Sequence, residues 1–257
     1  MKKAYASTPS GQIHYLTEGE GRPLVLLHQL PLSSDEYKEM IPAVGKRFQT
    51  LGMDIPGYGN SDEPDKYYAI EDYASSVIQF LDSLGIDQAS IVGTHSGAAI
   101  SVEVAAAYPE RVDSLILNGC PYLPPEVRKA RLADPKYDPM KIEKDGSHLI
   151  KIWEKARGWS PHSDPLYWHR WVVDCLNSGE RDAHQALFRY EIEKRLPLIK
   201  CPILLIYGTE DFLYSRMKET EELISGCKTK VIEGGGFILG YERAREFSEA
   251  ILEFLES

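Results

Sequence analysis

The stretch I-V-G-T-H-S-G-A-A-I, residues 91–100, joins two different hydrophobic patterns. Ser90–Val92 is a short apolar run bounded by polar residues and glycine, which is typical of a strand buried on both faces. Residues 98–107 are apolar almost all round, which predicts a helix in the middle of the protein. Gly93 and Gly97 lie at the junction. The stretch therefore predicts a buried strand that leads directly into a buried helix.

Strand-like runs and helical patterns alternate along much of the chain. The other runs that are too short for helices are Leu24–Leu27, Leu115–Leu117 and Ile203–Tyr207. Over residues 70–84, apolar residues recur at intervals of three and four, and Gly85 supplies a stop signal, so a helix is predicted there. A similar pattern predicts a C-terminal helix over 247–255. Strands that alternate with helices predict an α/β fold with a mostly parallel sheet.

The composition of the chain is that of a globular protein. Of its 257 residues, 43% are hydrophobic and 26% are charged, which excludes a disordered, collagenous or fibrous chain. The 39 acidic residues outnumber the 29 Lys and Arg residues and give a formal net charge of −10. A surface of this sign disfavours nucleic acids and anionic membranes as partners. We therefore expect a small-molecule partner and no nucleic acid or membrane partner.

The cysteines and the apolar runs bear on the compartment. The four cysteines are spread without a C-x-x-C pair: Cys120, Cys175, Cys201 and Cys227. That spacing argues against a disulfide framework or a zinc site. The N-terminal residues lack the apolar segment of a signal peptide, and the longest apolar runs fall far short of a membrane span. The expectation is a soluble cytoplasmic protein.

One long stretch interrupts the alternation of strands and helices. Residues 121–195 contain no strand-like run, and they begin with a proline-rich segment. All four tryptophans of the chain lie in this stretch: Trp153, Trp159, Trp168 and Trp171. The pattern predicts an irregular and then helical insertion between two strands. Its tryptophans either form a small core of their own or cover an apolar pocket at the edge of the sheet, and both can hold for different tryptophans.

Four segments in order resemble the α/β-hydrolase superfamily, and in particular its single-domain members with a helical cap. They are Met53–Asp62, Ile91–Ile100, Ala107–Val112 and Pro202–Asp211. The resemblance implies the α/β-hydrolase fold, with a mostly parallel central sheet of eight strands flanked by helices. It also implies a core formed by 1–120 and 196–257, a helical cap formed by 121–195, and an active site between them.

Enzymes of this superfamily carry their nucleophile on a sharp strand-to-helix turn with the pattern small-x-nucleophile-x-small. Gly93 and Gly97 place His95 at the centre, where a serine normally stands. This register fits the family's spacing to the Y-P-E-R-V segment without a gap. A shift by one residue instead places Ser96 at the centre, at the cost of an adjustment on either side. Both registers stay open at this point.

Of the other two members of the usual triad, the acid is present in the sequence and the histidine is absent. Asp211 follows the run Ile203–Tyr207, at the position where the family carries its triad acid. The late loop, however, has Phe237 where the family's histidine is expected, and no histidine follows His184. A Ser-His-Asp triad in its usual chain order therefore cannot be assembled.

The resemblance also suggests substrate-side residues. The segment His28-Gln29-Leu30-Pro31 resembles the family's H-G-x-P, which implies one oxyanion N–H from Gln29 or Leu30 and another from Ser96. His28 is either structural or part of this site. In the cap, His148 leads a patterned stretch that includes Trp153 and that could turn toward the pocket.

Three hypotheses for function follow. The first is an enzyme acting on a small, partly apolar molecule, with a His95–Asp211 general base, or a histidine nucleophile, desolvated by Phe237. The second is a hydrolase with Ser96 as nucleophile and a cap histidine such as His148 as base. The third is a non-catalytic binding protein with the same fold. A metal site from His28, His95 and Asp211 lacks supporting spacing, so no metal or cofactor is expected. Substrate identity and oligomeric state cannot be derived from the sequence.

Overall fold

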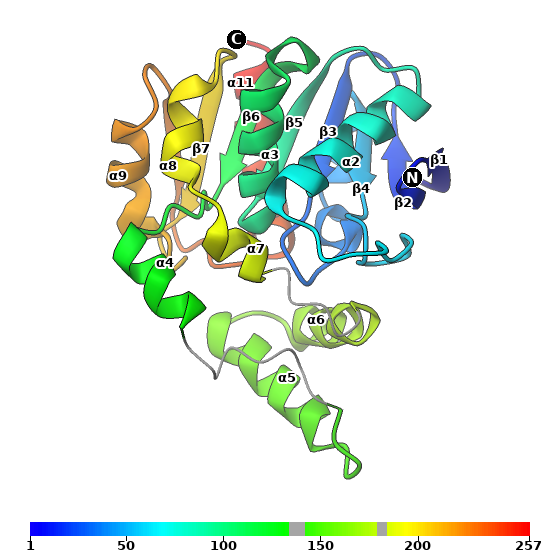
Figure 1. Ribbon diagram of the computed structural model, residues 1–257, viewed down its shortest axis with the longest axis vertical. Helices are drawn as coiled ribbons and strands as arrows, with labels where there is room; N and C mark the ends of the chain where they lie inside the picture. The colour runs from blue at the N-terminus through cyan, green and yellow to red at the C-terminus, as the bar shows by residue number, and fades with distance from the viewer. Residues whose placement is uncertain (134–141, 179–183) are drawn as a thin grey trace.

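The computed structural model of the protein describes residues 1–133, 142–178 and 184–257. An eight-stranded sheet runs through the molecule in the order β1-β2-β4-β3-β5-β6-β7-β8 (Figure 1). β1 pairs with β2, and β2 with β4, in antiparallel fashion, whereas the remaining neighbours are parallel. The α/β-hydrolase fold with a mostly parallel sheet is therefore confirmed.

The eight strands of the described ranges are β1 (Lys2–Thr8), β2 (Gly11–Glu18), β3 (Pro23–Leu27), β4 (Gln49–Met53), β5 (Ala89–Thr94), β6 (Val112–Asn118), β7 (Ile203–Gly208) and β8 (Lys228–Ile232). Four of them, β3, β5, β6 and β7, contain the runs that the sequence indicated, each extended by one or more residues. The helices of the core are α1 (Ile41–Val44), α2 (Ile70–Ser83), α3 (Ser96–Ala107), α9 (Met217–Glu222), α10 (Leu239–Glu242) and α11 (Ala244–Leu255). Short 3-10 turns are η1 (Ser34–Tyr37), η2 (Pro109–Arg111), η3 (Leu196–Leu198) and η4 (Tyr214–Arg216).

The inner parallel strands are buried on both faces because helices cover both sides of the sheet, whereas the edge strand β8 is largely exposed. Along β3, Val25 and Leu27 belong to the apolar cluster that includes α2 and α3, whereas Leu24 and Leu26 belong to the cluster that includes α1 and α11. This is the alternation that a strand imposes, since successive side chains point to opposite faces. The central helix α3 is buried almost throughout, as its apolar composition predicts.

The segment predicted as the cap lies between β6 and β7. Its helices are α4 (Pro125–Leu132), α5 (Ser147–Trp159), α6 (Pro165–Asn177), α7 (His184–Arg189) and α8 (Ile192–Arg195). Figure 1 shows α5 and α6 beyond the end of the sheet opposite the C-terminus. Residues 134–141 and 179–183 of the predicted cap lie outside the described residues. Among the helices of the described ranges, none has the length and apolar character needed to span a membrane.

Candidate active site

His95 occupies the sharp turn between β5 and α3. Its backbone has φ 49° and ψ −111°, and it is the one non-glycine residue with positive φ among the described residues. Gly97 is required beside it, because a Cβ there would lie 2.1 Å from the backbone oxygen of Leu27. A side chain held in such a conformation costs about 1–3 kcal/mol. The residue at the end of the buried strand β5 is therefore a histidine with a strained backbone.

His95 forms a buried pair with Asp211, which follows β7. The distance from His95 Nε2 to Asp211 Oδ2 is 2.7 Å, and the two side chains are 7% and 1% exposed. The other carboxylate oxygen of Asp211 accepts a hydrogen bond of 2.8 Å from the N–H of Leu213. Both oxygens of Asp211 are thus oriented, one by the backbone and one toward the imidazole.

The pairing fixes which nitrogen of His95 carries a proton. A carboxylate only accepts hydrogen bonds, so His95 donates from Nε2 and leaves the lone pair on Nδ1. Nδ1 has no hydrogen-bond partner within residues 1–133, 142–178 and 184–257. The ring therefore has one nitrogen committed to Asp211 and one basic nitrogen available to a ligand.

Aromatic rings surround the imidazole of His95. Phe237 contacts it edge to face with ring centroids 4.4 Å apart, and Phe212 lies at 5.6 Å. Phe237 also packs against Trp159 and Trp171 of the cap, at 4.8 and 5.6 Å. The residue that stands where the sequence lacked a histidine thus connects His95 to the aromatic core of the cap, and it shields the pair from water.

His95 lines a cavity of about 520 Å³ between the core and the cap. Apolar side chains dominate the lining, among them Leu30, Leu123, Val127, Trp159, Phe188 and Phe237. The volume lies within the range of about 300–1,000 Å³ that small-molecule sites occupy. The site therefore combines the imidazole of His95 with a cavity lined mainly by apolar side chains.

The backbone donors expected for an oxyanion are already engaged. The N–H of Leu30 donates to Ser96 Oγ at 2.7 Å, and the N–H of Gln29 donates to Glu36 Oε2 at 2.9 Å. Both N–H groups are thus engaged by side chains, and the expectation that one of them binds an oxyanion stays a prediction. The N–H of Leu30 is engaged because the hydroxyl of Ser96 lies directly in front of it.

Glu36 was not singled out in the sequence, because a carboxylate in a short 3-10 turn carries no distinctive signal. It is fully buried, and its Oε1 accepts a hydrogen bond from Gln29 Nε2 at 3.2 Å. Burial raises its pKa to about 8, although the bonds from Gln29 act in the opposite direction. Gln29 Nε2 also donates to the backbone oxygen of Phe237. Glu36 thus supports the loop on which Gln29 and Leu30 lie.

His28 has a structural place, not a substrate-binding one. Its Nε2 accepts a hydrogen bond of 2.9 Å from the N–H of Ile55, and its Nδ1 lies 3.0 Å from the backbone oxygen of Gln29. Because Nε2 accepts, Nδ1 is the nitrogen that donates, and the ring is neutral. Burial lowers its pKa, which favours the same neutral form. His28 does not line the cavity.

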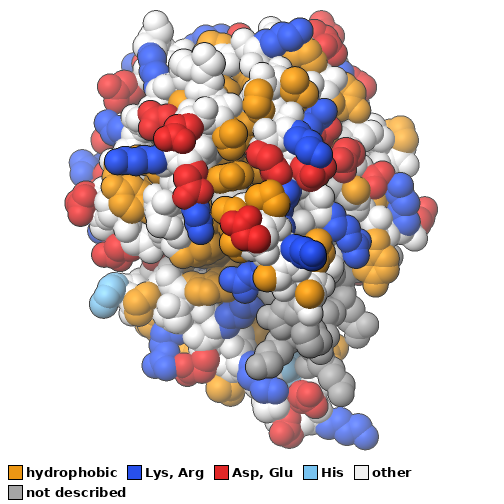
Figure 2. Space-filling view, turned by 60° about the vertical axis from the view of Figure 1, so that its left-hand side comes forward, with side chains coloured by type: hydrophobic (Ala, Val, Ile, Leu, Met, Phe, Trp, Pro, Cys, Tyr) orange, Lys and Arg blue, Asp and Glu red, His pale blue; other side chains and the backbone are white. Residues whose placement is uncertain are grey.

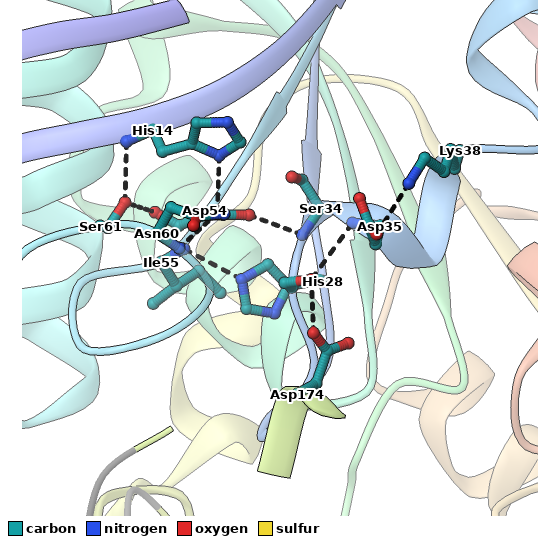
Figure 3. Close-up of polar contacts among 11 residues, drawn as sticks. His14, His28, Ser34, Asp35, Lys38, Asp54, Ile55, Asn60, Ser61 and Asp174 are labelled. Atoms are coloured by element: carbon teal, nitrogen blue, oxygen red, sulfur yellow. Dashed lines mark hydrogen bonds and ion pairs between the residues drawn. The ribbon is translucent and has the colours of Figure 1, made fainter. Parts of the chain in front are cut away.

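A second buried histidine–aspartate pair organises the neighbouring loop. Figure 3 shows Asp54 among His14, Ser34 and Asn60. Asp54 accepts from His14 Nδ1 at 2.7 Å, from the N–H of Ser34 at 2.7 Å and from the N–H of Asn60 at 2.9 Å. Burial by itself would raise the pKa of Asp54, but these bonds and the nearby His28 lower it. The pair shapes a loop, and neither member lines the cavity.

The same view shows Asp174 of α6 reaching the core (Figure 3). Ser33 donates a hydrogen bond of 2.9 Å to Asp174 Oδ1, while Oδ2 is buried without a partner among the described residues. Burial raises the pKa of Asp174 to about 7. This carboxyl is a polar contact between cap and core, and it lies outside the cavity lining.

Two cap residues predicted for the site lie elsewhere. Trp153 packs edge to face on Trp168, and Trp159 lines the cavity in its place. The two residues are six positions apart on α5, so they lie on different faces of a helix with 3.6 residues per turn. His148 accepts a hydrogen bond from the N–H of Glu143 and is not part of the cavity lining. The structure therefore does not bring it to Ser96.

Within the parts of the chain that the structure describes, no three His, Cys, Asp or Glu side chains converge to hold an ion. His28 is committed to backbone groups, which removes it from any set with His95 and Asp211.

Comparison with known proteins places this arrangement in a family context. Residues 22–244 match the family model described as the alpha/beta hydrolase fold. A stretch of 138 residues, 52% of the chain, is 36% identical to bifunctional epoxide hydrolase 2 of Mus musculus. A stretch of 115 residues, 44% of the chain, is 35% identical to haloalkane dehalogenase 2 of Mycobacterium tuberculosis. These matches cover only 23% and 40% of the two relatives.

A solved structure gives a likeness over the whole chain. The enol-lactonase from Burkholderia xenovorans LB400 superimposes with a TM-score of 0.80, covering 99% of this chain and 100% of that one. The sequence identity is 23%, so this likeness concerns the fold.

Proposed function

The chain belongs to the alpha/beta hydrolase fold family, and on that premise we propose that it is an enzyme with an atypical catalytic pair. His95 and Asp211 act together as a general base on a small, partly apolar organic molecule held in the cavity. The observation that carries the proposal is His95 itself, a strained residue that faces the cavity and is bonded to a buried carboxylate.

The chemistry uses the free nitrogen of the ring. Nδ1 of His95 removes a proton from a bound water or from the substrate, and Asp211 stabilises the imidazolium that forms. The buried Phe237 excludes water and so strengthens this electrostatic interaction. Attack by Nδ1 on the substrate is the nucleophilic variant of the same arrangement.

The alternative hydrolase, with Ser96 as nucleophile, has less support. Ser96 Oγ accepts a hydrogen bond from the N–H of Leu30. The histidine bonded to Asp211 is His95, which would have to act as the base for Ser96, the next residue in the sequence. His148 is bonded to Glu143 in the cap. Ser96 fits better as a group that holds the loop at Leu30.

A specific observation favours a second candidate, a small-molecule binding protein without catalysis. The N–H groups of Gln29 and Leu30 are both engaged by side chains, so these two donors are not available to a developing oxyanion. A cavity that only binds a ligand does not need such donors. The same geometry fits an enzyme if ligand binding displaces Ser96 Oγ from Leu30.

A substrate-independent experiment tests the basic nitrogen of His95. 2-Bromoacetophenone alkylates a neutral imidazole nitrogen with release of bromide, and peptide mass spectrometry locates the modification. We expect His95 to be modified and His14, which is paired with Asp54 through Nδ1 and lies outside the cavity, to remain unmodified. Equal modification of both, or of neither, contradicts an available base at the cavity.

Turnover is tested with a panel of small esters, lactones and epoxides. We expect at least one compound to be converted, with the rate reduced by about 100-fold or more in His95→Gln and in Asp211→Asn, as loss of a general base predicts. The matched control is His14→Gln, provided that it folds. Conversion that persists in both His95 and Asp211 variants overturns the proposal, and ligand binding without any conversion supports the second candidate.

A further inference from the structure

The charged side chains that line the cavity all have one sign. Arg131, at the end of α4, and Arg216, in η4, are both part of the lining, which contains no Asp or Glu from the described ranges. The protein as a whole has a net charge of −10. Figure 2, which faces the side carrying α4 and α9, shows Lys and Arg side chains near the level where the core meets the cap. The cavity is thus locally basic in an acidic protein.

The two guanidinium groups retain donors for a ligand. The guanidinium of Arg131 makes no hydrogen bond or ion pair with any residue in the described parts of the chain. Arg216 binds Glu219 through Nη1 alone, at 2.9 and 3.1 Å, so its Nη2 and Nε remain available. Other cap arginines are bound to carboxylates of the protein, for example Arg128 to Glu193 and Arg170 to Glu39. Among the described residues, Arg131 therefore differs from them in lining the cavity without a bound carboxylate.

The rest of the lining defines the body of the ligand. Trp159, Phe188 and Phe212 supply aromatic and apolar surface, and they come from three different segments around the chamber. His95 lies on the turn between β5 and α3, whereas the arginines come from α4 and η4. A ligand that meets both kinds of group has an anionic end and an apolar body.

From this geometry we propose that the cavity binds small aromatic carboxylates, with Arg131 and Arg216 holding the carboxylate and the apolar walls holding the ring. Guanidinium groups match a planar carboxylate with two parallel hydrogen bonds, which a lysine cannot do. The inference rests on the proposed function in one respect only, because it takes the same cavity as the substrate site. It names the chemical class that the proposed base would act on.

The test compares two probes of the same shape that differ in charge. Binding of 2-naphthoate and of neutral 2-naphthamide is measured by titration calorimetry with the wild-type protein. We expect naphthoate to bind at least about tenfold more tightly, since hydrogen bonds to charged groups contribute enough for such a factor. Equal affinity, or no binding of naphthoate, overturns the proposal.

Variants then assign the preference to the two arginines. We expect Arg131→Gln and Arg216→Gln each to remove most of the preference for naphthoate while leaving naphthamide binding unchanged. Arg216→Lys keeps the charge but loses the planar group, and we expect an intermediate loss. Arg157→Gln, an exposed cap arginine paired with Glu154, is the matched control and should behave as the wild type. A naphthoate affinity that is unchanged in both glutamine variants contradicts the assignment.

One further variant separates this proposal from the proposed catalysis. In His95→Gln, the arginine-dependent preference for naphthoate should persist, because that residue does not hold the carboxylate. If His95 is alkylated and turns over substrate but the arginines have no effect on naphthoate, only the carboxylate inference fails. If the arginines control binding but no turnover occurs, only the catalytic proposal fails.

Discussion

Two buried histidine–aspartate pairs in this molecule have the same hydrogen-bond length and different surroundings. His14 and Asp54 are 2.7 Å apart, and so are His95 and Asp211. His14 lies in a regular strand, and Asp54 accepts two further backbone N–H groups that shape a loop. His95 instead has a strained backbone and faces a cavity. The comparison teaches that a short His–Asp contact does not by itself indicate chemistry, whereas strain and access to a cavity do.

The largest expected effect is on the free energy of unfolding, which should fall more when Asp54 is replaced than when Asp211 is replaced. Asp54→Ala leaves three buried donors without an acceptor, so we expect the free energy of unfolding to fall by about 3–5 kcal/mol. Asp211→Ala leaves two donors, one of them on a ring that borders the cavity, and we expect a loss of about 1–3 kcal/mol. Denaturant unfolding measures both. Similar losses would mean that the second pair is as structural as the first.

Titration of two buried carboxyl groups, Glu36 and Asp54, should change the free energy of unfolding in opposite directions. Folding raises the pKa of Glu36 from 4.5 to about 8, so the folded protein keeps a proton that the unfolded chain releases. Stability from this group is fully present below pH 4.5 and is lost as the pH rises through about 8. Folding lowers the pKa of Asp54, so its contribution is present above pH 3.8 and is lost at lower pH. Asp174, with a pKa of about 7, adds to the first effect.

We therefore expect the free energy of unfolding to fall between pH 5 and pH 7.5, by about 3 kcal/mol from Glu36 and by about 2.5 kcal/mol more from Asp174, measured by denaturant unfolding in matched buffers. Glu36→Gln should remove the Glu36 part of this slope and leave the Asp174 part, because the amide has no proton to release. The exposed Glu39→Gln is the control and should retain the slope. A slope that is the same in both variants would show that Glu36 does not cause it.

Because the backbone at His95 is strained, we expect glycine to be more stable than alanine at this position, the reverse of the usual order. Glycine adopts positive φ without a steric penalty, so His95→Gly should be more stable than His95→Ala by about 1–2 kcal/mol. In the strand at His14, we expect the ordinary order, with alanine more stable than glycine by about 0.5–1 kcal/mol. Thermal unfolding of the four variants makes the comparison. The same order at both positions would contradict a strained turn at His95.

The smallest expected effect is no effect at all. A fluorophosphonate probe labels activated serines, and we expect no labelling of Ser96, because its hydroxyl is bonded to Leu30 and His95 is bonded to Asp211. Mass spectrometry of the intact protein measures the labelling, with an ordinary serine esterase as the positive control. Stoichiometric labelling at Ser96 would transfer the catalytic role from His95 to its neighbour.

Much of the fold could be predicted because it depends on local patterns. The runs at Leu24–Leu27 and Ile203–Tyr207 are apolar on both faces, and that pattern is found where helices cover both sides of a parallel sheet. The positions of His95 and Asp211 were expected from the resemblance to the α/β-hydrolase superfamily. The topology explains why they meet, because parallel strands end at the same edge of the sheet and the residues that follow β5 and β7 come together.

The details of the site could not be predicted, because they depend on contacts between segments distant in the chain. Trp159 and not Trp153 reaches the cavity, since the orientation of α5 is set by packing against α6 and not by its own sequence. The N–H of Leu30 is engaged by Ser96, 66 positions away, which no spacing rule reveals. Arg131 and Arg216 attract no notice in the sequence and line the same cavity only after folding.

The sequence by itself determined that strands and helices alternate, that a sharp turn lies at His95 or Ser96, and that a late histidine is absent. These features follow from hydrophobic period, from glycine at positions 93 and 97, and from residue identity at one position. Only the tertiary structure decided which donors are engaged, which aromatic rings enclose His95 and which charges face the cavity. The physical reason is that burial and hydrogen bonding depend on distances between side chains, and the chain order does not contain those distances until the segments pack.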